Sequence, residues 1–163
     1  MFTYTATCLP EWTDYNDHMN DAMYGRVFSD AIDAMMNNIG LDAAYREQTK
    51  GTIYTVEDHR WYEAEVHEGA NLRVETHLLD FDAKRLHIWQ AIYVGKTHYD
   101  SAGNIAPQKR CAVCETMLLH ISQASAEPKT APMPEGVLAM LEQHKTAEAL
   151  SPRSAAMGIR RKG

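Results

Sequence analysis

The residues that could do chemistry are concentrated in a short polar segment near the N-terminus. Residues 14–20 read Asp-Tyr-Asn-Asp-His-Met-Asn, and they place Asp14, His18 and Asn20 within seven positions. A carboxylate can activate water as a general base or attack a carbonyl carbon directly, and an imidazole can orient groups or relay protons. The same residue types are also common helix caps, so the spacing alone supports function and N-capping equally.

A second group alternates along a β-prone stretch. Glu57, His59 and Trp61 are two residues apart, so on a strand they share one face. A carboxylate beside an imidazole can hydrogen-bond to it and fix its tautomer. The group is therefore a candidate for catalysis, and the alternative is the solvated face of an edge strand.

Four aromatic residues flank these two groups, namely Trp12, Tyr15, Trp61 and Tyr62. Aromatic faces next to carboxylates suit a quaternary ammonium group, which has no N–H to donate. Most tryptophans and tyrosines serve instead as core or interface residues. Strand alternation puts Trp61 and Tyr62 on opposite faces. We expect Trp61 to line a pocket, because it shares a face with Glu57 and His59.

The polar segment lies directly before a predicted helix. Apolar residues between Met23 and Ile39 keep helical spacing, which predicts a helix over 21–38 with Asn20 or Asp21 as N-cap and Gly40 after its end. The N–H groups at such a helix start can stabilise an oxyanion. Several small residues along the helix indicate that it lies at the centre of a surrounding sheet. An ordinary amphipathic surface helix is the alternative.

The rest of the chain is mostly β-prone. Strands are predicted in 2–9, 52–66, 71–80, 86–94 and 110–122, with a turn-rich stretch before the second of them. Consecutive strands after one early helix predict an α+β fold with an antiparallel sheet. A closing helix is predicted over 135–150. We therefore expect a single domain, with its main body in 1–125 and a linker, C-terminal helix and basic tail in 126–163.

Composition narrows the function classes. The 163 residues carry a net charge of −6, which argues against broad binding to nucleic acid. No apolar run is long enough to span a membrane and no signal peptide is evident, so we expect a cytoplasmic protein. Cys8, Cys111 and Cys114 are expected to be free thiols. Cys111 and Cys114 would point to opposite faces of a strand, and no metal-ligand spacing is recognisable.

At these residues the sequence resembles a known family. The segment EWTDYNDHMNDAMY, residues 11–24, resembles the opening of hotdog-fold thioesterases of the 4-hydroxybenzoyl-CoA thioesterase type. The resemblance implies that Asp14 is the catalytic carboxylate, that an antiparallel sheet wraps around a central helix, and that two copies pair with active sites at their interface. Asp17 departs from the glycine expected in this loop.

Two further segments point to a more specific group within this family. YTVEDHRWYEAEV and DFDAKRLHIWQAIY, with the first segment, resemble betainyl-CoA thioesterases of bacterial carnitine breakdown over about residues 5–122. The implied activity is hydrolysis of a small acyl-CoA thioester by a homodimer or homotetramer, with the thioester as substrate and no cofactor. Asp14, His18, Glu57 and His59 would then be catalytic. Asn20 and the four aromatic residues would bind substrate, and Lys84, Arg85 and Arg110 would contact CoA.

Two alternatives remain open from the sequence. One is a hotdog hydratase or dehydratase, which would hydrate a 2-enoyl-CoA without releasing thiol. The other is a non-catalytic module that binds betaine or carnitine.

Overall fold

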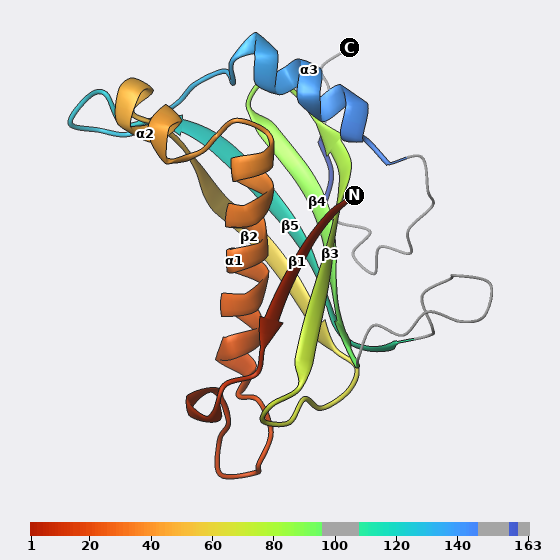
Figure 1. Ribbon diagram of the computed structural model, residues 1–163. Helices are drawn as coiled ribbons and strands as arrows, with labels where there is room; N and C mark the ends of the chain where they lie inside the picture. The colour runs from red at the N-terminus through yellow and green to blue at the C-terminus, as the bar shows by residue number, and fades with distance from the viewer. Residues whose placement is uncertain (96–107, 147–156, 160–163) are drawn as a thin grey trace.

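The computed structural model describes residues 1–95, 108–146 and 157–159 (Figure 1). A strongly curled antiparallel sheet has the strand order β1-β3-β4-β5-β2, and β6 pairs with β5. The predicted α+β class is confirmed. The strands are β1 Phe2–Thr7, β2 Gly51–Tyr62, β3 Asn71–Phe81, β4 Arg85–Val94, β5 Lys109–Ser122 and β6 Lys129–Thr130.

The helix α1, Asp21–Asn38, lies along the concave side of the sheet (Figure 1). Its apolar stripe is buried against apolar residues of β3, β4 and β5. The Asn20 side chain accepts a hydrogen bond from the Ala22 N–H, which confirms Asn20 as N-cap. Gly40 follows the helix with a φ of 85°, a value that glycine adopts without steric cost. This packing fixes where α1 begins.

Three elements differ from the prediction. A short helix α2, Ala43–Thr49, occupies the stretch expected to be turns, because Asp42 caps it and Lys50 ends it in a left-handed conformation. β2 stops at Tyr62 instead of Val66, since the N–H groups of Glu63 and Ala64 both turn to donate to one carbonyl of β5. The closing helix α3 is Glu135–His144, and residues 147–150 of the predicted helix lie outside the described residues. Within the described residues, no helix is long and apolar enough to cross a membrane.

The three cysteines are free, as expected, and they are also buried, but Cys111 and Cys114 do not point to opposite faces. Both pack into the core cluster that holds α1. The strand pairing explains this, because Ile92 pairs with Ala112 and Tyr93 with Arg110, so Cys111 is the extra residue of a β-bulge. Burial raises the pKa of Cys114 to about 11, and the thiol is therefore unreactive at neutral pH.

The convex face of the sheet carries a polar network that includes a strongly acidic carboxyl group. Glu75 on β3 bonds to Arg73, and its other oxygen lies 3.7 Å from His77 Nε2. His77 first, and then Arg73, holds the pKa of Glu75 at about 2 although burial opposes this. Glu75 is therefore ionised in the folded protein at any ordinary pH, and it ties neighbouring side chains of β3 together.

This network predicts a pH-dependent stability. Because the folded pKa of Glu75 lies below the ordinary value of 4.5, its contribution is present above about pH 4.5 and is lost as the pH falls toward 2. We expect Glu75→Gln to lower the free energy of unfolding by about 1–3 kcal/mol at neutral pH, at about 1.4 kcal/mol per pKa unit. Urea unfolding at several pH values measures this. Glu57→Gln, which alters an exposed glutamate–histidine pair, is the control. If Glu75→Gln lowered the free energy of unfolding as much near pH 2 as at neutral pH, the proposed role of ionised Glu75 would be contradicted.

Candidate active site

The polar segment before α1 forms a compact loop at the end of the molecule where α1 begins. Its base is closed by a bridge between Thr13 and Met19 and by a hydrogen bond of 2.9 Å from the Asp14 N–H to the His18 carbonyl. The Met19 N–H donates to the Val66 carbonyl at 2.7 Å. The loop is therefore held both by itself and by the segment that follows β2.

A cavity of about 610 Å³ opens between this loop, the first turn of α1 and the end of β2. It is rich in negative charge, because four carboxylates line it against one lysine, Lys109, and the imidazole of His18. The four carboxylates are Asp14, Asp21, Glu63 and Glu65. Such a lining favours a cationic or proton-donating group in the cavity.

Two tyrosines form the aromatic part of the lining. The rings of Tyr24 and Tyr62 meet edge to face with centroids 5.1 Å apart. Tyr24 is buried, and its hydroxyl donates to the Ala64 carbonyl at 3.3 Å. Burial raises the pKa of Tyr24 to about 12, so the ring stays neutral and adds no charge of its own.

Asp14 is the half-buried carboxylate of the loop, and only one of its two oxygens is engaged in a hydrogen bond to the described residues. Its Oδ1 accepts a hydrogen bond of 2.8 Å from the Asn16 N–H, which fixes the side chain in place. Its Oδ2 makes no hydrogen bond to the described residues, so this oxygen is available to water or substrate. Nearby, the Ala22 N–H at the start of α1 is shared by the Asn20 and Asp21 side chains at 3.0 and 2.9 Å.

The structure separates the second predicted group from Asp14 within one chain. Glu57, His59 and Trp61 do share one face, with a glutamate–histidine bond of 2.9 Å and a stacked histidine–tryptophan pair. That face is the convex one, however, where Trp61 packs against the cluster of Trp89, Ala91 and Val113. Within one chain Tyr62 lines the cavity and Trp61 does not, so Tyr62 takes the place that we expected for Trp61 in this cavity.

The other aromatic candidates lie outside the cavity. Trp12 packs against the core cluster beneath the loop. Tyr15, at the tip of the loop, is 94% exposed. Neither side chain lines the cavity of this chain.

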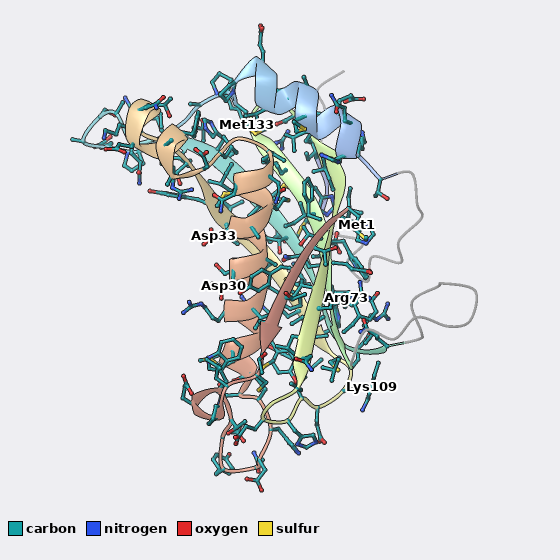
Figure 2. The ribbon with its side chains drawn as sticks, in the orientation of Figure 1. Met1, Asp30, Asp33, Arg73, Lys109 and Met133 are labelled. Carbon is teal, nitrogen blue, oxygen red and sulfur yellow. The ribbon has the colours of Figure 1, made fainter. Side chains whose placement is uncertain are left out.

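The predicted CoA contacts are divided between the two ends of the molecule. The hairpin that carries Lys84 and Arg85 is joined to Met133 by a hydrogen bond from the Met133 N–H to the Ala83 carbonyl. Figure 2 shows Met133 at the end opposite Lys109, which lines the cavity. Arg85 pairs with Asp82. Arg110, next to Lys109, makes a two-pronged contact with Glu63 at 2.6 and 3.0 Å.

Sequence reasoning missed Tyr24, Glu63 and Glu65 as lining residues. Tyr24 is one turn into α1 from Asn20, so its helical spacing could have placed it beside the loop. Glu63 follows Tyr62 directly, and Glu65 comes two residues later, after Ala64. Only the early end of β2 directs them into the cavity, and no local pattern signals that end.

Comparison with known proteins matches the chain to a thioesterase family model, to curated relatives and to solved structures. The model of the thioesterase-like superfamily matches residues 8–141. A betainyl-CoA thioesterase of Pseudomonas aeruginosa is 43% identical over 86% of this chain and 80% of its own length. An L-carnitine dehydrogenase/betainyl-CoA thioesterase of Ruegeria pomeroyi is 36% identical over 93% of this chain, which spans only 28% of that longer protein. A Staphylococcus aureus protein solved in complex with CoA superposes with a TM-score of 0.75 at 26% identity, over 99% of this chain and 95% of that one.

Proposed function

The chain belongs to the thioesterase-like superfamily and is a hotdog-fold acyl-CoA thioester hydrolase, and we propose that its substrate is betainyl-CoA, which it cleaves to glycine betaine and CoA. The observation that carries this proposal is the cavity that combines Asp14 with further carboxylates and two tyrosines. The betainyl-CoA thioesterase of P. aeruginosa supports it independently. No comparable observation favours the hydratase or the betaine-binding module.

In the proposed reaction, Asp14 acts on the thioester carbonyl. Its Oδ2 either takes a proton from a water molecule that attacks the carbonyl carbon, or attacks that carbon itself before water completes hydrolysis. The carbon–sulfur bond then breaks, and the CoA thiolate leaves and takes up a proton. The developing oxyanion would lie at the positive end of α1 and take over the Ala22 N–H from Asn20 and Asp21. His18 would orient the reacting groups. Water is the only co-reactant, so the reaction needs no resident cofactor.

The acyl group would be recognised through its charge. A trimethylammonium group offers no N–H, so it binds best to aromatic faces with negative charge nearby. Tyr24 and Tyr62 supply the faces, and Asp21 and Glu65 supply charge without being the attacking group. A neutral acyl group of equal shape would gain the apolar contact but not the electrostatic attraction.

We also propose that the working form is at least a dimer. β2 is an edge strand, and its exposed residues include Tyr54 and Val56; an unpaired edge of twelve residues readily pairs with another strand. Antiparallel pairing of two β2 edges about their centre would place the Gly51 end of one copy beside the Tyr62 end of the other. The partner would then bring its own Lys84 and Arg85 end toward Asp14, where those residues could reach the CoA phosphates.

A cytoplasmic location is proposed on chemical grounds. Cys8, Cys111 and Cys114 are all free, which suits a reducing compartment. CoA, the leaving group, is itself a thiol and needs the same environment to stay reduced.

Replacement of Asp14 tests the reaction. Asp14→Asn keeps the Oδ1 acceptor for the Asn16 N–H and should preserve the fold, but it should lower kcat for thiol release by roughly 10²–10⁴-fold. Asp17→Asn is the matched control. It removes a carboxylate from the same loop at a position with a φ of 61°, which asparagine tolerates, and it should stay within a few-fold of the parent. Equal activity in the two variants would remove Asp14 from the mechanism.

Replacement of Tyr62 tests the acyl group. We expect kcat/KM for betainyl-CoA to exceed that for its neutral tert-butyl isostere. Loss of one cation–π contact, worth about 1–2 kcal/mol, should reduce this preference by roughly 5–30-fold in Tyr62→Leu. Trp61→Leu removes the neighbouring ring on the other face of β2 and should leave the preference unchanged. A preference near unity in the parent protein would leave a general short-chain thioesterase.

Sedimentation equilibrium tests the assembly. At micromolar concentration the parent protein should have twice the chain mass or a higher multiple. Val56→Lys would place two like charges close together at the centre of paired β2 edges and should weaken association. Met140→Lys, an exposed apolar residue on α3, is the control and should not change the mass. An active monomer would disprove the paired-edge arrangement.

A further inference from the structure

We propose that the rim of the cavity carries a site for a first-row transition-metal dication such as Zn²⁺, held by His18, Glu65 and His67. The potential ligand atoms of these three side chains lie within 4.8 Å of one another. Glu65 Oε2 is 3.3 Å from His18 Nε2, and the two imidazole rings meet edge to face with centroids 5.0 Å apart. Two imidazoles and one carboxylate form a donor set that zinc accepts, with a fourth position left for water.

The tautomer of His67 is already set for coordination. Its Nδ1 lies 3.0 Å from the Asp17 carbonyl oxygen, and since a carbonyl can only accept, Nδ1 carries the proton. Nε2 therefore presents a lone pair, as in metal-bound histidines whose other nitrogen is held by a backbone carbonyl. The carbonyl is turned toward His67 by the left-handed backbone of Asp17, whose φ is 61°, an uncommon conformation for a residue other than glycine.

The side chains can close the distance that coordination requires. A zinc ion needs its nitrogen and oxygen ligands at about 2 Å. Glu65 and His67 are exposed, so rotation of their side chains meets little packing resistance, while His18 is partly buried and anchored by the loop. His67 is also held by its hydrogen bond to Asp17, so Glu65 is the ligand that can adjust most freely around an entering ion.

Other histidine–carboxylate pairs lack this arrangement. Glu57 and His59 are 2.9 Å apart and partly exposed, but the described residues offer them no third ligand, and the ring of His59 stacks on Trp61. Residues 1–95, 108–146 and 157–159 contain no other group of three ligands at this spacing. His18 is far from Glu65 and His67 along the chain, so no local pattern of residues indicates the site.

Metal binding would act on the hydrolase, a consequence that rests on the proposed function. His18 and Glu65 line the same cavity as Asp14. A dication there would engage His18, neutralise Glu65 and repel a trimethylammonium acyl group. Zinc should therefore inhibit turnover of betainyl-CoA more strongly than turnover of its neutral isostere, through a rise in KM.

The binding experiment uses the full chain without an affinity tag, stripped of metal and titrated with ZnCl₂ by calorimetry. We expect one ion per chain and at least a tenfold weaker affinity in both Glu65→Gln and His67→Ala. Glu57→Gln and His59→Ala are matched controls that should bind as the parent does. Co²⁺ in place of zinc should give the visible absorption of a four-coordinate ion, absent in Glu65→Gln. No saturable binding, or equal losses in the control pair, would overturn the site.

Zinc inhibition of thiol release is measured separately from zinc binding. Zinc inhibition that disappears in Glu65→Gln supports the coupling between the metal and the cavity. Binding without any effect on thiol release overturns that coupling. If the protein proves not to hydrolyse betainyl-CoA, calorimetry still decides the metal site, because it requires no substrate.

Discussion

The burial of α1 against the concave side of the sheet is the constraint on which the rest of the structure depends. Its apolar stripe can be removed from water in only one rotation and one position along β3, β4 and β5. That position fixes the first residue of the helix, and the preceding loop is then tied by Met19 to the segment after β2. The cavity follows from this geometry, because it is the space enclosed by the helix start, the loop and the end of β2.

Much of the fold could be predicted from the sequence, because its signals are local. The periodicity of α1, its Asn20 cap and Gly40 end, and the β-prone run that forms β3 all depend on neighbouring residues, and each is confirmed. The position of Asp14 at the helix start follows from the same signals. The cap of α2 was also local, but a helix of seven residues is too short to show a clear period.

What could not be predicted depends on which way a strand faces. On β2 both faces are polar, with Asp58 and Arg60 toward α1 and Glu57 and His59 away from it, so alternation does not reveal which set meets the helix. The pairing of Tyr62 with Tyr24 settles the question, and it is a tertiary contact. Bulges have the same effect. The extra residue at Cys111 places its thiol in the same core cluster as Cys114. No local pattern in the sequence predicts this bulge.

Within the described part of the chain, two of the four carboxylates that line the cavity are paired with a basic side chain and two are not. The unpaired carboxylates explain how the cavity can attract a cation. Glu63 is neutralised by Arg110 and Glu65 lies against His18. Asp14 and Asp21 form no salt bridge with the described residues, and they lie at the start of α1, where the helix dipole offers about half a positive charge. Among the described residues, Lys109 is the one lysine that lines the cavity beside these two carboxylates. The cavity therefore has more carboxylates than cations in its lining, and this surplus of negative charge would attract either an ammonium group or a metal ion.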